Sequence, residues 1–114
     1  MEEWIRGKLI TIEVGGKEYS LGYPTRKDAV NAEMHGLDIT EAGKILSLTN
    51  TLFYTGLLAK QEKITREMSN ELLEQYIEEG GEIEEITQFL INEYTAFMKS
   101  PNGKKKKKAK IVEV

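Results

Sequence analysis

The chain offers few side chains for catalysis or metal binding, and the most versatile of them is a single histidine. The 114 residues contain one His, His35, and no Cys. Without Cys there is no disulfide, thiolate metal site or cysteine nucleophile, and one His with scattered carboxylates is a weak metal signal. We expect His35 to lie at the end of a short helix, where the helix dipole favours a cation. The sequence predicts no catalytic residue, metal site or cofactor, and it favours a binding or assembly protein over an enzyme.

Two other motifs could be interpreted as a metal site and a phosphate site, but a structural role explains each motif better. Five glutamates surround a glycine pair: Glu78, Glu79, Glu82, Glu84 and Glu85. They lack the Asp/Asn spacing and the glycine of a calcium loop, so we interpret them as a solvated helix junction. Gly15-Gly16-Lys17 lacks the spacing of a phosphate-binding loop and fits a tight turn.

The charges divide the chain into an acidic body and a basic end. Residues 1–103 hold 10 Lys+Arg and 18 Asp+Glu and carry −8, whereas residues 104–114 hold six Lys and one Glu and carry +5. The run of lysines in residues 104–110 has three interpretations: a solvated tail, a nonspecific tether to phosphates, or a contact with an acidic surface such as a second copy. Nucleic-acid binding as the main function is disfavoured, because the acidic body is repelled by phosphates. The six lysines are Lys104, Lys105, Lys106, Lys107, Lys108 and Lys110.

Alternating apolar residues predict a β-hairpin over residues 4–23. Gly15-Gly16 tolerates the positive φ of a two-residue turn, and such a turn places the apolar residues of both strands on one face. An isolated hairpin is marginally stable, so this face must rest on other elements. The unpaired edge of the hairpin also allows pairing with the hairpin of a second copy. The register pairs Val14 with Lys17, Ile12 with Tyr19 and Ile10 with Leu21.

A first short helix is predicted over about residues 26–35. Thr25 and Asp28 stand where a capping box requires them, and Gly36 is a natural stop. Apolar residues at helical spacing predict that one stripe of this helix is buried. The stripe consists of Val30, Met34 and Leu37.

A second, central helix is predicted from a cap at Thr40 to about Lys60. It is apolar on several sides, which is typical of a helix contacted by several neighbours. Gly56 lowers its helix propensity by about 1 kcal/mol relative to Ala. This cost indicates either close packing at Gly56 or a break in the helix.

Two acidic helices are predicted to complete the body. Thr65 can cap one over about residues 66–79, with Met68, Leu72 and Tyr76 on its apolar face and Leu73 as a further candidate for that face. The other begins at Glu82 and spans about 18 residues, with apolar residues at three- and four-residue spacing. That stripe consists of Ile83, Ile86, Leu90, Tyr94 and Phe97.

The predicted fold is therefore α+β: an N-terminal hairpin and about four helices in one domain, residues 1–100, with a flexible basic tail, residues 101–114. A domain of this size leaves part of its apolar surface uncovered, and an exposed apolar patch marks a partner site. No window has the composition of a membrane span and the acidic N-terminus is unlike a signal peptide, so we expect a cytoplasmic protein. The candidate partner-binding residues are Phe53, Tyr54, Phe89, Tyr94, Phe97 and Met98.

Four segments in a fixed order carry a family resemblance. They are the hairpin around Val14 to Leu21, the segment Met34 to Ile39, the apolar helix Leu46 to Ala59, and two acidic helices that end at Tyr94 to Phe97. This order resembles the tail assembly chaperones of long-tailed phages and prophages of Gram-positive bacteria, over about residues 8–100. The resemblance lies in element order, length and character, and it carries over no active-site residue.

The resemblance implies a function in tail morphogenesis. Such proteins bind the long tape measure protein, keep it soluble, help to recruit tail tube subunits around it, and are absent from the finished virion. Their genes are commonly read by programmed ribosomal frameshifting, which yields a longer second product. A slippery A-rich message encodes consecutive lysines, so Lys104–Lys108 also fit a trace of that signal.

An alternative from another class is a small cytoplasmic regulator or adaptor that contacts nucleic acid through its lysine-rich tail. Binding of this kind depends on salt and disappears when the chain is truncated after Gly103. An enzyme ranks last, because nothing in the sequence places two carboxylates in a cleft.

Overall fold

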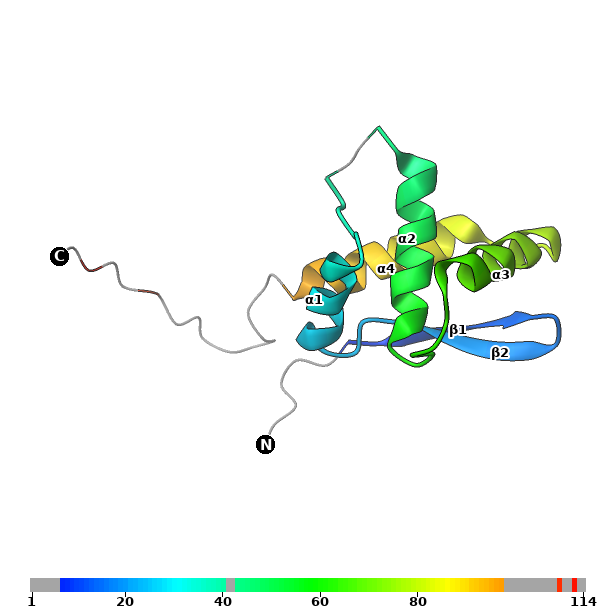
Figure 1. Ribbon diagram of the computed structural model, residues 1–114, viewed down its shortest axis with the longest axis horizontal. Helices are drawn as coiled ribbons and strands as arrows, with labels where there is room; N and C mark the ends of the chain where they lie inside the picture. The colour runs from blue at the N-terminus through cyan, green and yellow to red at the C-terminus, as the bar shows by residue number, and fades with distance from the viewer. Residues whose placement is uncertain (1–6, 41–42, 98–108, 110–111, 113–114) are drawn as a thin grey trace.

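Two glycines with positive φ turn the chain back on itself and create the hairpin. Gly15 (φ 60°) and Gly16 (φ 79°) join strand β1 (Leu9–Val14) to strand β2 (Lys17–Gly22). The computed structural model describes residues 7–40, 43–97, 109 and 112; the first residues of the predicted hairpin, 4–6, lie outside this set (Figure 1). The strands pair antiparallel, and the predicted register is confirmed. The hairpin buries Ile12, Val14 and Leu21 on one face.

Helix α1 (Arg26–Met34) begins at the predicted capping box. The Thr25 hydroxyl accepts a hydrogen bond from the Asp28 amide, and the Asp28 carboxylate accepts one from the Thr25 amide. Gly36, at φ 100°, ends the helix as predicted, and the Leu37 amide then donates to the Ala32 carbonyl. This turn directs Leu37 into the core.

The predicted buried stripe of α1 is wrong for two of its three members. Val30 and Met34 are exposed, Met34 at 79%, whereas Ala29 and Ala32 are buried. The small alanine side chains let α1 approach the core closely, so the larger side chains of the helix are left outside. Only Leu37, which lies beyond the helix, is buried as predicted.

Helix α2 (Ile45–Leu58) starts later than predicted. Thr40 does not cap it, because the Thr40 amide and hydroxyl both donate to the Asp38 carboxylate in a local turn. Lys44 occupies the N-cap position without a side-chain cap hydrogen bond. The helix therefore begins without the cap that the sequence suggested.

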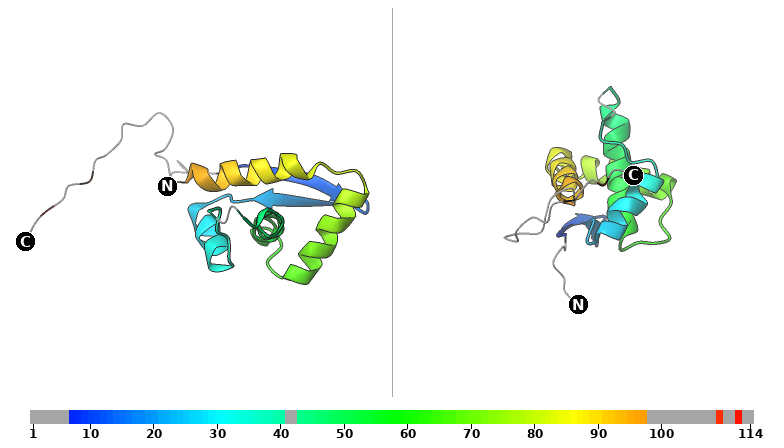
Figure 2. Two further views of the ribbon diagram at one scale, coloured as in Figure 1. Left: turned by 90° about the horizontal axis from the view of Figure 1, so that it is seen from above. Right: turned by 90° about the vertical axis from the view of Figure 1, so that its left-hand side faces the viewer.

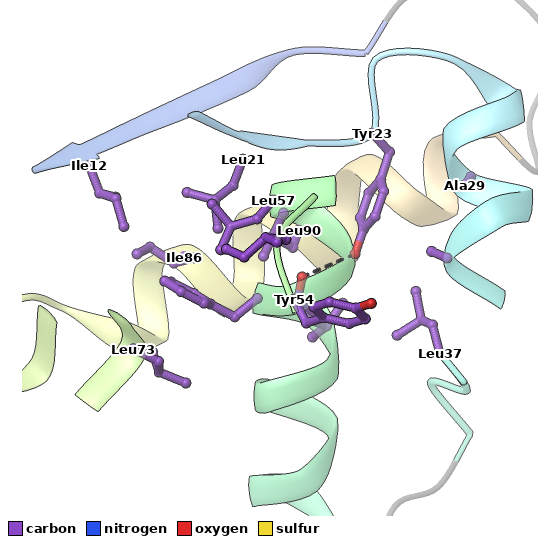
Figure 3. Packing of buried hydrophobic residues seen from close by; sticks show 14 of the residues in the cluster. Ile12, Leu21, Tyr23, Ala29, Leu37, Tyr54, Leu57, Leu73, Ile86 and Leu90 are labelled. Atoms are coloured by element: carbon purple, nitrogen blue, oxygen red, sulfur yellow. Dashed lines mark hydrogen bonds between the residues drawn. The ribbon is translucent and has the colours of Figure 1, made fainter. Parts of the chain in front are cut away.

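The second half of α2 forms the centre of the core. Every residue from Leu52 to Leu57 is buried, and in Figure 3 Leu57 lies beside Leu21 of β2 and Leu90 of α4. A Cβ on Gly56 would lie 3.0 Å from Leu90 Cδ2, so this glycine allows close packing and the helix continues through it. Of the two interpretations of Gly56, close packing is the correct one.

Helix α3 (Arg66–Glu78) and helix α4 (Ile83–Ala96) complete the body. Thr65 caps α3 by accepting a hydrogen bond from the Met68 amide, as predicted. Of the predicted apolar face of α3, Leu73 is buried and Leu72 and Tyr76 pack partly buried against the core, whereas Met68 is 51% exposed. Ser69 is buried beside Leu73. Helix α4 buries Ile86 and Leu90, and the end predicted for it, up to Lys99, lies outside the described residues.

The elements pack around α2, and the predicted α+β fold is confirmed. Seen along α2 in Figure 2, this helix lies between α1 and α3, while α4 runs beside the hairpin. The buried Tyr23 hydroxyl, just after β2, is 2.8 Å from the Thr55 hydroxyl of α2, and burial raises the pKa of Tyr23 well above its ordinary value. The hairpin face therefore rests on α2, as an isolated hairpin requires. The predicted tail, residues 101–114, lies outside the described residues except for Ala109 and Val112.

Candidate partner-binding surfaces

Two of the predicted partner-binding aromatics are core residues. Phe53 and Tyr54 are only 2% and 8% exposed. The Arg66 guanidinium lies 4.7 Å from the centre of the Tyr54 ring, and the His35 ring meets it edge-on at 5.9 Å. These contacts occupy Tyr54 within the fold. The expectation that Phe53 and Tyr54 are exposed to a partner is therefore wrong, because both belong to the hydrophobic core.

The other candidates lie on or after α4. Phe89, Tyr94 and Phe97 are half-buried and pack against the core, and Met98 lies outside the described residues. The Tyr94 hydroxyl donates to the Glu33 carboxylate of α1. Burial and this hydrogen bond raise the pKa of Tyr94 to about 12. These residues join α4 to the body and expose only part of their rings.

His35 lies at the end of α1, as predicted. Its ring Nδ1 is 2.9 Å from the Asn31 carbonyl oxygen one turn earlier, and its own carbonyl accepts a hydrogen bond from Arg66. Together with the contact to Tyr54, these interactions give His35 a structural role that links α1, α2 and α3.

The glutamates at the junction of α3 and α4 do not form a metal site. Among the described residues, no group of His, Cys, Asp or Glu side chains is arranged to hold a metal ion. Glu79 instead accepts hydrogen bonds from the Gln75 amide at 2.9 Å and from the Gly15 backbone amide at 3.1 Å. The bond from Gln75, and then the bond from Gly15, lower the pKa of Glu79. This carboxylate thus connects α3 to the hairpin turn.

The first turn of α2 carries an exposed apolar pair that the sequence did not single out. Ile45 and Leu46 are 67% and 83% exposed, and we call this pair the α2 tip. It borders a hollow of about 700 Å³ between α2 and α4, the α2–α4 groove. The sequence feature that could have indicated this pair is the breadth of the apolar surface of α2, which is wider than the surrounding elements cover. The other lining residues are Thr49, Glu82, Ile83, Glu84, Glu85, Thr87 and Gln88.

A second hollow, the hairpin–α3 groove, lies at the opposite end of α2. Its volume is about 670 Å³, and its apolar part is made by Tyr19 of β2, Ile64 of the α2–α3 loop, and Met68 and Leu72 of α3. Charged and amide side chains form the rest of its lining: Lys17, Lys60, Gln61, Glu62, Lys63, Glu71 and Gln75.

Comparison of the chain with protein-family models, with curated proteins and with solved structures finds no match. Within the described residues, no helix combines the length and apolar character that crossing a lipid bilayer requires. The six tail lysines, residues 104–108 and 110, lie outside the described residues.

Proposed function

We propose that this protein is a cytoplasmic tail assembly chaperone that binds a helical segment of a tape measure protein in the α2–α4 groove. The observation that supports the proposal is the α2 tip. Two adjacent large aliphatic side chains, Ile45 and Leu46, stand in solvent beside a groove. Exposed apolar surface of this kind marks a site for a protein partner.

The chemistry of the groove suits an amphipathic helix. Such a helix lays its apolar stripe into a groove between two helices, with apolar residues at three- and four-residue spacing as its main contacts. Ile45, Leu46 and Ile83 offer apolar contact to that stripe. A tape measure protein, which is long and helical before the tail tube encloses it, presents stripes of this kind.

The rim of the groove accounts for the solubility of the complex. Glu82, Glu84 and Glu85 are exposed beside the apolar lining, where they can face lysine or arginine residues that flank the stripe of the partner. The acidic body, at −8 over residues 1–103, keeps the complex charged, and net charge opposes precipitation. The chaperone therefore covers apolar surface and adds charge at the same time.

The remaining steps follow from the same role. The chaperone holds the tape measure protein until tail tube subunits assemble around it, and it is left out of the finished virion. The native gene provides an independent check, because codons 104–108 that lack an A-rich slippery heptamer would exclude a frameshift at that position.

Coexpression with a tape measure fragment tests the proposal. We expect the wild-type chain to keep the fragment soluble and Leu46→Glu to lose this effect, because a carboxylate replaces the apolar contact. Met34→Glu is the matched control, since Met34 is 79% exposed but lies on α1. If Leu46→Glu folds and still solubilises the fragment, the α2–α4 groove is not the binding site.

A further inference from the structure

The hairpin–α3 groove concentrates positive charge on a body that is acidic. Three of the six lysines in the described residues, Lys17, Lys60 and Lys63, line it. With Glu62 and Glu71 also present, the lining carries one net positive charge, whereas the body as a whole carries −8. We propose that this groove binds an acidic segment of a partner protein, with a large aliphatic or aromatic side chain of that segment as its apolar anchor.

The three lysines are available to such a segment. Their side chains are exposed, and none of them forms a salt bridge within the described part of the chain. Lys17 Nζ lies 5.9 Å from the centre of the Tyr19 ring, while Lys60 and Lys63 belong to the loop between α2 and α3. A carboxylate that reaches these ammonium groups gains a charge-assisted interaction without breaking an ion pair of the fold.

The walls of the groove separate apolar contact from charge. Helix α3 contributes Met68, which is 51% exposed, and Leu72, which packs partly buried against the core. The flexible thioether of Met68 adapts to anchors of different shape. The neighbouring hollow along α3 is lined by glutamates, which repel an acidic segment. The anchor therefore faces α3, and the carboxylates of the segment face the lysines of β2 and of the α2–α3 loop.

The size of the groove restricts what it holds. Its volume of about 670 Å³ lies within the range of sites that enclose a small ligand. Such a site accommodates an anchor side chain and its immediate neighbours, and the flanking carboxylates remain at the rim with the lysines. The occupant is therefore a short segment of the partner.

The two grooves of this chain select opposite charges. The lining of the α2–α4 groove contains three glutamates and no lysine or arginine, and complementary charge selects the partner of each groove and its orientation. The α2–α4 groove borders the first turn of α2, whereas Lys60 follows its last turn, and a helix of 14 residues is about 21 Å long. In Figure 1 the first turns of α2 rise away from the hairpin. Both grooves can therefore be filled at once, and one chain can join two partners.

Peptide binding tests the proposed site. The probe is a fluorescein-labelled peptide with a Leu-Leu pair flanked on both sides by glutamates. Fluorescence anisotropy is measured at concentrations of the full chain at which sedimentation velocity shows a monomer. The wild-type chain is expected to bind this peptide, and Lys60→Glu/Lys63→Glu is expected to weaken binding by about tenfold or more, because the carboxylates of the peptide then meet like charge.

Two altered peptides separate charge from apolar contact. A peptide in which alanines replace the leucines is expected to bind the wild-type chain more weakly by about tenfold, since it lacks the anchor. A peptide in which lysines replace the glutamates is expected to prefer Lys60→Glu/Lys63→Glu to the wild-type chain. Equal binding of the alanine peptide would overturn the apolar anchor and with it the proposal.

The matched control is Lys8→Glu/Lys27→Glu, which makes the same change of charge at exposed lysines outside the groove. It is expected to bind the acidic peptide like the wild type, and circular dichroism establishes that each variant is folded. The proposal is overturned if the wild-type chain does not bind the acidic peptide, or if Lys60→Glu/Lys63→Glu binds it equally well.

The same charge-reversal variant keeps this site distinct from the proposed function. Its lysines lie outside the α2–α4 groove, so Lys60→Glu/Lys63→Glu is expected to solubilise a tape measure fragment like the wild type. A loss of peptide binding with unchanged solubilisation supports two separate sites. If solubilisation is lost together with peptide binding, the two grooves do not act separately and the proposal of a second site is wrong.

Discussion

The two halves of α2 both carry large apolar side chains, but their surroundings are opposite. Ile45, Leu46 and Leu48 belong to the first half, and only Leu48 packs against the core, whereas Leu52 and Leu57 in the second half are fully buried. The hairpin, α3 and α4 surround the second half, and the first half extends beyond them (Figure 1). The exposure of Ile45 and Leu46 shows that burial along this helix depends on which elements lie beside each turn as well as on residue type.

Close packing and polar pairing both distinguish the buried half. Gly56 lets Leu21 and Leu90 approach the helix backbone. The Thr55 hydroxyl donates to the Thr51 carbonyl at 2.8 Å and accepts from Tyr23, so this buried polar group is satisfied. The first half lacks a side-chain cap at its N-terminus. The buried half therefore serves the fold, and the exposed half is available for binding.

The largest expected contrast compares two leucines of α2. Leu57→Ala should lower the free energy of unfolding by about 2–5 kcal/mol, because a fully buried leucine leaves a cavity. Leu46→Ala should change it by less than about 0.5 kcal/mol, as is usual for a surface substitution. Urea denaturation followed by circular dichroism measures both. Equal effects would show that the first half of α2 is covered in solution.

Gly56 provides the next contrast. Gly56→Val should lower the free energy of unfolding by about 1–3 kcal/mol, because the added atoms overpack the contact with Leu90. Ser47→Val, in the exposed half, should stay within about 0.5 kcal/mol of the wild type. Thermal and urea denaturation test the pair. A Gly56→Val variant as stable as the wild type would contradict the close approach of α4.

The polar pair at Thr55 should give a smaller effect. Thr55→Val removes the acceptor for the Tyr23 hydroxyl and should lower the free energy of unfolding by about 1 kcal/mol. Thr49→Val makes the same chemical change in the first half of α2 and should have a smaller effect. Equal losses would indicate that burial of the hydroxyl pair contributes nothing to stability.

The smallest expected effect lies outside α2, at Glu79. Its pKa is lowered from an ordinary value of 4.5 by the hydrogen bonds from Gln75 and Gly15. A carboxyl group with a lower pKa in the folded state stabilises the fold fully above its unfolded-state pKa, and this stabilisation disappears as the pH falls through the folded-state value. Glu79→Gln should therefore be slightly less stable than the wild type near neutral pH, and the difference should vanish in acid.

Urea midpoints measured at a series of pH values test this expectation. Glu78→Gln is the control, since Glu78 is exposed and has no hydrogen-bond partner among the described residues. If the difference in urea midpoint between Glu79→Gln and the wild type grows as the pH falls, the sign is the reverse of the one expected. That result would contradict a stabilising role for the Glu79 carboxylate.

Local signals account for what the sequence predicted correctly. The hairpin register follows from period-two alternation and a Gly-Gly turn. The capping box at Thr25 and the single cap at Thr65 follow from side chains that reach backbone amides three residues away. Helices α3 and α4 follow from apolar spacing. All of these depend on residues close together in the chain, so neighbouring residue types are sufficient to specify them.

The candidate site was predicted less well, for a physical reason. Phe53 and Tyr54 are aromatic, which suggested a binding surface, but the packed elements bury them. Val30 and Met34 have core spacing, but the smaller Ala29 and Ala32 brought the other face of α1 inward. In each case the side chain fits a core or a surface equally well, and only its neighbours distinguish the two.

By itself the sequence determined the α+β order, the hairpin register, the helix caps at Thr25 and Thr65, and the division of charge between the body and the end of the chain. Each of these is set by local backbone chemistry or by composition. Only the tertiary structure decided which half of α2 is core and that Ile45 and Leu46 remain in solvent. It also brought Lys17 of β2 together with Lys60 and Lys63 after α2. These features depend on contacts between residues far apart in the chain, and such contacts exist only once the elements have packed.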